Sequence, residues 1–274
     1  MRLCLSLALI LFLSPLTAFA GDPTPDLQPW QKPGATAGDE ISGPDGGTMI
    51  WVPPGEFDMG SRDGRPDEQP VHHVRLTHGF WLRKSPVTQA QYQRYCQETG
   101  ADFPAGGDGD LFPVVNIGWK DAADYCKHYG MTLPTEAQWE YAARGKDGRV
   151  YPWGNDWSPS LCCNWQNRGP NAHAFPIGSF PQGASWCGAL DMAGNVWQWC
   201  ADWYDSKYYA ASPAADPPGP DEGEALPVIG QVRVLRGGCW SIDDPTVFRS
   251  AHRGYVDNPS ARRDGYGFRC VFVP

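Results

Sequence analysis

The side chains best suited to chemistry in this 274-residue sequence are its nine cysteines. Eight of them lie beyond the apolar amino terminus: Cys96, Cys126, Cys162, Cys163, Cys187, Cys200, Cys239 and Cys270. Their spacing contains no CxxC pair and no Cys/His pattern typical of zinc, so disulfides are favoured over metal ligation. Cys239 follows a Gly-Gly pair and precedes Arg249 and Arg253, whose positive charge would favour a reactive thiolate. A disulfide to Cys200 or Cys187 is the alternative for Cys239.

The amino terminus indicates the compartment in which these thiols act. Arg2 precedes an apolar run that reaches Leu13, and Ala18-Phe19-Ala20 forms an A-x-A cleavage site. Residues 1–20 are therefore predicted to be a signal peptide cleaved near Ala20, which makes the protein periplasmic or secreted. Disulfides form in such oxidising compartments. No other apolar run is long enough to span a membrane, and a net charge of -9 argues against a nucleic-acid partner.

The sequence predicts a linker followed by one domain. Residues 21–47 are rich in proline and glycine, which is typical of an extended linker, and the domain is predicted to cover 48–274. Alternating residues over 49–59 predict a hairpin of two strands that turns at Pro-Pro-Gly. A second strand pair is predicted over 71–76 and 80–83.

Helix signals are clearer than strand signals in this sequence. Thr88 and Thr135 are each followed three residues later by glutamine, so both are predicted to be N-caps. The helices that they open are predicted to end at Gly100 and Gly145. A third predicted helix lies between these two and points Cys126 into the core.

Several motifs resemble one known family. They are LPTEAQWEYAARG at 133–145, GNVWQW at 194–199, RVLRGGCW at 233–240 and GFRC at 267–270. Together they resemble the formylglycine-generating enzyme domain, also called the sulfatase-modifying factor domain, over nearly the whole predicted domain. The resemblance implies a mixed α/β (α+β) fold that is related to C-type lectins, forms a single domain and has little regular secondary structure.

The resemblance also identifies what this sequence lacks. Members that make formylglycine use two cysteines to hold Cu(I), a soft ion that prefers two thiolates. Those positions correspond to Ile242 and to a residue near Val247, and no cysteine lies between Cys239 and Cys270. A copper cofactor is therefore not expected. The sequence is more similar to periplasmic members of the family that act in pyoverdine maturation without this cysteine pair.

A disulfide and a calcium site are implied by the same resemblance. Cys126 and Cys270 match the positions of a long-range family disulfide. The calcium ligands would be the Asp191 side chain, the backbone carbonyls of Gly194 and Val196, and Gln198, where the family has glutamate. Oxygen ligands in a tight turn suit Ca²⁺, but the loss of one carboxylate predicts weaker binding.

The resemblance places a substrate groove beside Cys239, the candidate catalytic residue. Its predicted lining consists of Asn195, Trp197, Trp203, Trp240 and Arg253. The function favoured by the sequence is oxidative maturation of a peptide or a siderophore precursor. The alternative is a non-catalytic module that binds a peptide or a glycan in the lectin-like groove. A sulfatase activator that makes formylglycine is a third and less favoured reading.

Overall fold

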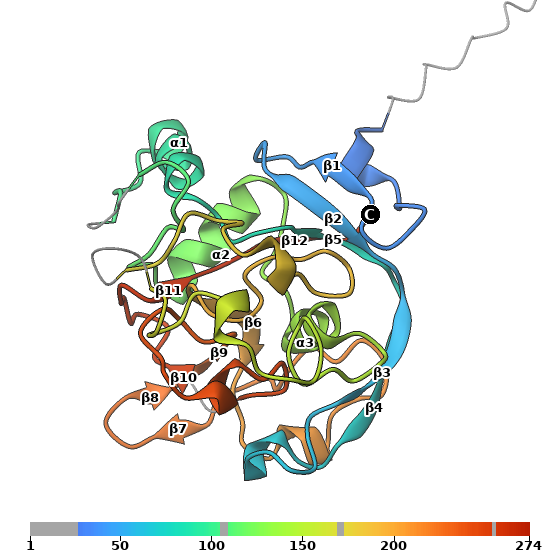
Figure 1. The fold of residues 1–274 in the computed structure, drawn as a ribbon. Helices are drawn as coiled ribbons and strands as arrows, with labels where there is room; N and C mark the ends of the chain where they lie inside the picture. The colour runs from blue at the N-terminus through green and yellow to red at the C-terminus, as the bar shows by residue number, and fades with distance from the viewer. Residues whose placement is uncertain (1–26, 105–108, 169–172, 254–255) are drawn as a thin grey trace, which may run out of the picture.

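The computed structural model describes residues 27–104, 109–168, 173–253 and 256–274, so the predicted signal peptide lies outside the described residues. Figure 1 shows short strands and helices joined by long loops. The strands are β1 Glu40–Ser42, β2 Thr48–Val52, β3 Gly55–Met59, β4 His72–Leu76, β5 Phe80–Arg83, β6 Trp197–Trp203, β7 Ala225–Leu226, β8 Gly230–Gln231, β9 Arg233–Arg236, β10 Val256–Asp257, β11 Tyr266–Gly267 and β12 Val271–Phe272. The α-helices are α1 Gln89–Thr99, α2 Trp119–His128 and α3 Glu136–Arg144. The 3-10 helices are η1 Pro29–Gln31, η2 Pro66–Glu68, η3 Pro159–Leu161, η4 Pro181–Gly183, η5 Tyr208–Ala210 and η6 Pro245–Phe248.

The amino-terminal strands form one long ribbon. β2 pairs with β5, and β3 pairs with β4, both antiparallel, so that Val52 faces Phe80 and Gly55 faces Leu76. The two predicted hairpins were therefore paired wrongly, because β2 and β3 together make one arm of the ribbon and β4 and β5 make the other. Alternation identifies a strand but does not identify its partner.

The first sheet also begins earlier than predicted. β1 pairs with β2 in a four-stranded sheet of order β1-β2-β5-β12, so the predicted linker over 21–47 ends before residue 40. A turn at Asp45-Gly46-Gly47 closes this hairpin, and the Asp45 carboxylate accepts a hydrogen bond from the backbone N–H of Gly47 at 3.0 Å. Aspartate followed by glycine is typical of a turn. The glycines that suggested a linker here form the turn of a hairpin.

A second sheet lies at the centre of the carboxy-terminal half. Its order is β10-β9-β6-β11, with β6 antiparallel to β9 and parallel to β11. The pairing of β6 with β9 shifts between Trp199 and Trp203, so the strand changes register along its length. A short antiparallel hairpin of β7 and β8 projects from the lower left of the molecule in Figure 1.

Helices α1 and α3 confirm the two predicted caps. Thr88 and Thr135 accept hydrogen bonds from the backbone N–H groups of Gln91 and Gln138, and both capping boxes are complete. Gly100 and Gly145 end α1 and α3 with positive φ angles of 76° and 65°, which suit glycine because it has no Cβ.

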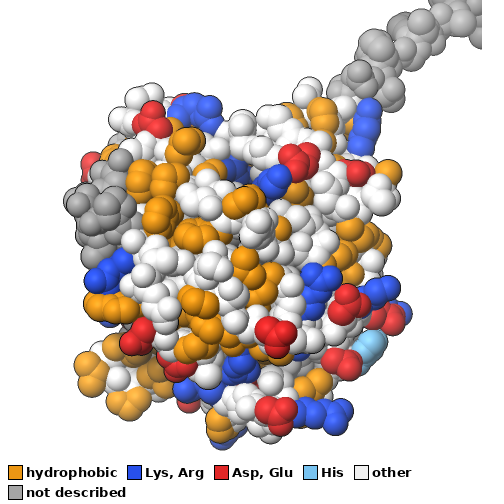
Figure 2. Space-filling view, viewed as in Figure 1, with side chains coloured by type: hydrophobic (Ala, Val, Ile, Leu, Met, Phe, Trp, Pro, Cys, Tyr) orange, Lys and Arg blue, Asp and Glu red, His pale blue; other side chains and the backbone are white. Residues whose placement is uncertain are grey.

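Two large apolar clusters form most of the core. One packs α3 against β2 to β5 and β9, and the other packs α1 and α2 against the second sheet. This is the mixed α/β fold with few helices that was predicted. Within the described residues no helix has the length and apolar character needed to cross a bilayer. Acidic and basic side chains are interspersed on the face shown in Figure 2.

Candidate functional site

A small pocket opens between η2, the start of β6 and the loop that contains η6. Its volume is about 220 Å³. The lining residues are Arg65, Trp197, Ile242, Asp244, Thr246, Val247, Arg249 and His252. By the family resemblance, the missing copper cysteines correspond to Ile242 and to a residue near Val247. The pocket therefore lies where the family resemblance places the active site.

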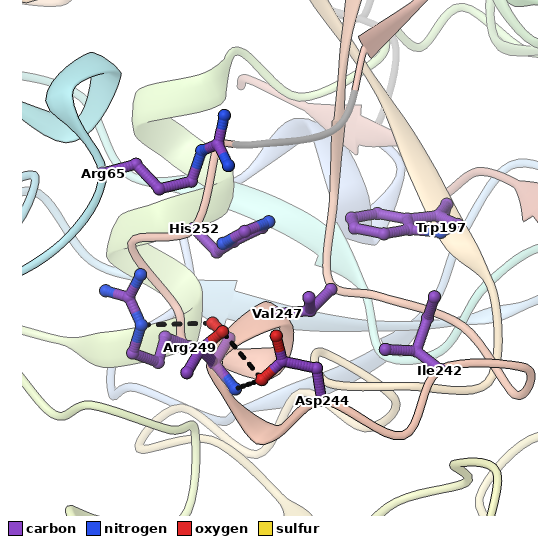
Figure 3. A pocket seen from close by; sticks show the side chains of 8 residues that line it. Arg65, Trp197, Ile242, Asp244, Val247, Arg249 and His252 are labelled. Carbon is purple, nitrogen blue, oxygen red and sulfur yellow. Dashed lines mark hydrogen bonds between the residues drawn. The ribbon is translucent and has the colours of Figure 1, made fainter.

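One side of the pocket is apolar. Trp197 is the first residue of β6 and is 2% exposed, and it lies on the same side as Ile242 and Val247 (Figure 3). None of these three side chains carries a thiol or a carboxylate, so this wall offers no ligand for a soft metal ion. The Trp197 ring itself contacts the His252 ring, with 6.4 Å between centroids and 36° between planes, so an aromatic ligand can reach only the edge of the indole.

The opposite side of the pocket carries His252. This imidazole is 6% exposed, and its Nδ1 atom has no hydrogen-bond partner among the described residues. The nearest carboxylate oxygen is Oε1 of Glu68, at 3.8 Å from Nδ1. Burial, with the charges of Arg236 and Arg249, lowers the pKa of His252 to about 4. The pocket therefore contains a neutral imidazole at neutral pH, suited to hydrogen bonding with a bound ligand.

The low pKa of His252 predicts a pH-dependent loss of stability. An unfolded histidine has a pKa near 6.5. Between about pH 6.5 and 4, His252 is therefore protonated in the unfolded chain and neutral in the folded chain. The contribution of neutral His252 to the free energy of unfolding is complete above pH 6.5 and is lost as the pH falls through 4. At the lower end of this range the free energy of unfolding is lower by about 3 kcal/mol.

Denaturant unfolding of wild type and of His252→Gln at pH 7 and pH 4 measures this contribution. The wild type should lose about 3 kcal/mol more than the variant over this interval. His78→Gln, in an exposed loop, is the matched control and should follow the wild type. Equal losses in wild type and His252→Gln would contradict the assignment of a neutral, buried imidazole.

The charged residues of the pocket rim are already paired. Arg249 forms a bidentate ion pair with Glu68, with N–O distances of 2.8 and 2.7 Å. The Asp244 carboxylate caps η6 by accepting a hydrogen bond from the Thr246 N–H at 2.9 Å. Arg65 donates from Nε to Asp67 at 3.3 Å, and its side chain is 55% exposed. Arg65 is therefore the rim cation with the most freedom to meet a ligand.

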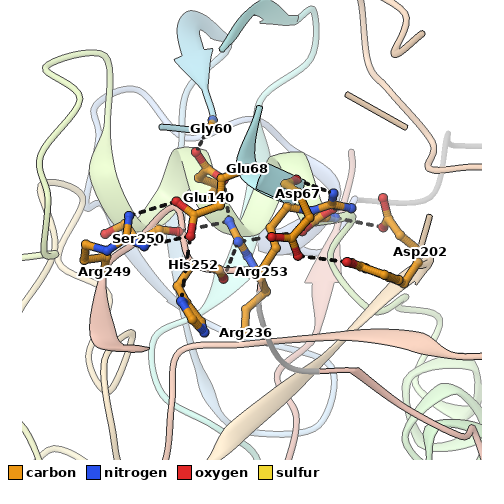
Figure 4. Close-up of polar contacts among 12 residues, drawn as sticks. Gly60, Asp67, Glu68, Glu140, Asp202, Arg236, Arg249, Ser250, His252 and Arg253 are labelled. Carbon is orange, nitrogen blue, oxygen red and sulfur yellow. Dashed lines mark hydrogen bonds and ion pairs between the residues drawn. The ribbon is translucent and has the colours of Figure 1, made fainter. Parts of the chain in front are cut away.

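A buried cluster of ion pairs lies behind the pocket (Figure 4). Arg253 donates from Nε and Nη2 to the two carboxylate oxygens of Glu136, at 2.8 and 3.0 Å, and from Nη1 to the Asp67 carbonyl. Arg236 pairs with Glu140 in the same cluster. Arg253 is 0% exposed. The predicted substrate contact of Arg253 is therefore corrected, because its guanidinium faces α3 and the chain before β4 instead of the pocket.

Cys239 does not line the pocket. It is buried in the second core cluster, where its sulfur lies 3.2 Å from the Ser241 hydroxyl. Burial raises the pKa of the Cys239 thiol, and Arg249 and Arg253 are engaged with carboxylates instead of the sulfur. Cys187 and Cys200 pack in the other core cluster. The structure therefore gives no support to Cys239 as an activated thiol.

The other predicted groove residues have separate positions. Asn195 holds a turn, with its amide bonded to the N–H and carbonyl of Phe175. Trp203 stacks on the Arg233 guanidinium at 3.5 Å, and Trp240 donates to the Asp264 carbonyl. Of the predicted groove set, Trp197 lines the pocket.

The predicted disulfide partners are neighbours. The sulfurs of Cys126 in α2 and Cys270 before β12 lie 2.9 Å apart, and both residues are fully buried. The structure represents both as thiols, so their bond stays a prediction.

The predicted calcium ligands share one turn, but Gln198 does not direct an oxygen atom into it. The Asp191 carboxylate accepts a hydrogen bond from the Gly178 N–H at 3.1 Å, and Gly194 donates its N–H to the Gly237 carbonyl. Gln198 directs its amide nitrogen, not its oxygen, towards the carbonyls of Asp191 and Val196. Calcium needs oxygen atoms at such positions. Within the described residues no group of three His, Cys, Asp or Glu side chains is placed to hold a metal ion.

Sequence reasoning missed His252 and Arg65. His252 lies between Arg249 and Arg253, two arginines that the sequence analysis singled out, so their spacing could have drawn attention to it. Arg65 comes from a loop more than a hundred residues away from η6, and no local pattern connects the two. The substitutions at Ile242 and Val247 were the best sequence signal for the pocket itself.

Comparisons with known proteins identify the family of this chain. Residues 38–273 match the family described as Sulfatase-modifying factor enzyme 1-like domain. The formylglycine-generating enzyme of Streptomyces coelicolor is 34% identical, over 81% of this chain and 88% of its own. The structure of PvdO from Pseudomonas aeruginosa superposes with a TM-score of 0.73 and 26% identity, over 87% of this chain and 99% of that one.

A further relative is a longer protein. The serine/threonine-protein kinase Pkn1 of Chlamydia trachomatis serovar L2 is 38% identical over 81% of this chain, but this match spans 38% of the relative's length. The shared region corresponds to the domain described above. The match of residues 38–273 and the 34% identity to a relative of similar length show that this chain belongs to the sulfatase-modifying factor enzyme 1-like family.

Proposed function

We propose that this chain binds a hydroxylated aromatic group of a peptide or siderophore-type substrate in the pocket lined by Trp197 and His252, and supports its oxidative maturation without copper. The observation that carries this proposal is the pairing of a flat apolar wall with a neutral imidazole across a pocket of about 220 Å³. Because the Trp197 and His252 rings lie 6.4 Å apart, centroid to centroid, the ligand ring would enter beside them, over Ile242 and Val247, with a hydroxyl at its edge bonded to the imidazole. The predicted signal peptide supports an exported site of action.

The relatives that are named formylglycine-generating enzymes, 34% and 38% identical to this chain, support an enzyme in preference to a binding module. In the proposed reaction a catechol group loses two hydrogen atoms and becomes a quinone, while dioxygen accepts them and becomes hydrogen peroxide. The role of this chain would be to hold the ring over Ile242 and Val247 and to orient its hydroxyl at His252. A base with a pKa near 4 is too weak to take a catechol proton efficiently, so His252 is assigned a positioning role.

That weakness favours the second candidate, which is binding without catalysis of a peptide or a glycan. The two candidates differ in turnover. A peptide with a catechol side chain is incubated with the protein in air, and hydrogen peroxide and quinone are measured above the protein-free background. Product that forms in wild type and falls in Val247→Phe, which fills the pocket, supports the enzyme. Retained binding with no product above background refutes the maturation reaction and leaves a binding module.

Formylglycine synthesis is separately excluded by this proposal. The pocket offers Ile242 and Val247 where two thiolates are needed, and Cys239 is buried outside it. A cysteine-containing sulfatase peptide supplied with copper and a reductant should therefore stay unchanged in mass. Conversion that is lost in Cys239→Ala would show that the catalytic thiol was misplaced.

A further inference from the structure

The side chain of Gln198 lies at the centre of a buried group of hydrogen bonds. Its oxygen accepts from Trp139 Nε1 at 2.9 Å and from Arg269 Nε at 2.6 Å. Both of these groups can only donate. They therefore fix which end of the amide is oxygen and which is nitrogen, and the two ends cannot be exchanged without loss of both bonds.

The nitrogen of Gln198 consequently faces the turn before β6. Nε2 donates to the Asp191 carbonyl at 2.6 Å and lies 3.5 Å from the Val196 carbonyl. Arg269 adds a second donor, because its Nη2 reaches the carbonyls of Leu190 and Asp191 at 2.7 and 3.3 Å. Three carbonyls of this turn, those of Leu190, Asp191 and Val196, therefore face N–H groups.

This turn needs such support because its backbone is strained. Asp191 and Asn195 have φ angles of 54° and 65°, in the left-handed region, which aspartate and asparagine adopt more often than other residues with a Cβ but still at a cost. Such conformations persist only where surrounding contacts fix them. Trp197, the apolar wall of the pocket, begins the strand that follows.

We infer that Gln198, together with Arg269, takes the place of a metal ion in this turn. A cation would need oxygen atoms directed at it from Gln198 and from the carbonyls. Here the amide nitrogen and the guanidinium instead supply hydrogen-bond donors to the carbonyls of Leu190, Asp191 and Val196. The turn, and with it the position of Trp197, is therefore independent of metal.

The test is the change of one atom, Gln198→Glu. The carboxylate keeps an oxygen for Trp139 and Arg269 but places its second oxygen against the carbonyls of Asp191 and Val196. In the presence of a calcium chelator the Tm should fall by roughly 4 to 10 °C, because a buried donor is replaced by a repelling acceptor. Added calcium should restore most of the lost Tm, since a cation can bridge these oxygens. The wild-type Tm should be the same with chelator and with calcium.

Gln89→Glu is the matched control. Gln89 is also buried and donates from Nε2 to one backbone carbonyl, that of Pro113 at 3.3 Å. Its glutamate variant should lose stability without recovery in calcium. Failure of calcium to raise the Tm of Gln198→Glu would overturn the inference that the amide nitrogen occupies a cation's place.

If Gln198→Glu does not fold, calcium binding by the wild type alone tests the inference. Wild-type protein incubated with calcium and then desalted should retain no stoichiometric calcium by elemental analysis. Retained calcium at this turn, accompanied by a Tm that falls with chelator and recovers with calcium, would overturn the inference. These readouts do not depend on the proposed function, so its failure leaves them unaffected.

Discussion

Arg253→Met should lower the free energy of unfolding by about 3 to 5 kcal/mol, the cost of leaving one partner of a buried ion pair without the other. The Glu136 carboxylate, which now accepts two bonds from Arg253, would remain buried with only the more distant Arg236, at 3.7 Å. Methionine fills a similar volume, so the loss should come from charge. Denaturant unfolding with an unchanged m-value would measure it.

The control is an arginine–carboxylate ion pair at the surface. Arg262 lies 2.6 Å from Asp121, and its side chain is 53% exposed, so Arg262→Met should cost no more than about 1 kcal/mol. The double variant Arg253→Met with Glu136→Gln should recover part of the loss, because it removes the unpaired carboxylate. A loss in Arg253→Met no larger than in Arg262→Met would contradict the structural role of Arg253.

The Cys126–Cys270 disulfide carries the second large expected effect. Protein made in an oxidising compartment should contain this bond, since the two sulfurs are adjacent and joined residues lie 144 positions apart in the chain. Replacing both cysteines by alanine should lower the free energy of unfolding by about 4 to 5 kcal/mol in the chain-entropy model. Reductant should lower the free energy of unfolding of the wild type by the same amount. It should not change the free energy of unfolding of the double variant.

Cys96→Ala is the control for loss of a cysteine side chain. Cys96 lies at the edge of the core in α1, and its replacement should leave the response to reductant unchanged. A peptide map of folded, unreduced protein that shows Cys126 or Cys270 as a free thiol would refute the bond.

The sequence predicted the parts of the fold that local chemistry determines. Thr88 and Thr135 supply caps whose geometry depends on residues within one turn, and Gly100 and Gly145 end the same helices. The family resemblance also predicted the fold class, because motifs such as 133–145 are long enough to identify a fold. Neither source of information depends on knowing which distant segments meet.

Long-range contacts account for most of the errors. Alternation over 49–59 identified the strands but not their partners across the ribbon. Arg253 looked like a recognition residue because an arginine is seldom buried, and only the structure shows Glu136 against it. His252 gains its neutral state from burial and from Arg236 and Arg249, which no single stretch of sequence reveals.

Isothermal titration calorimetry of a catechol-bearing peptide with wild type and with Val247→Phe tests the central claim that this pocket is the binding site. The same peptide with phenylalanine and a neutral oligosaccharide serve as competing probes. Wild type should bind the catechol peptide more tightly than either probe, and Val247→Phe should weaken that binding by roughly tenfold or more, which is about 1.4 kcal/mol. Val273→Phe, at a half-exposed position near the carboxy terminus, should bind like wild type. Equal affinity in wild type and Val247→Phe, or no binding of the catechol peptide to wild type, would contradict the account.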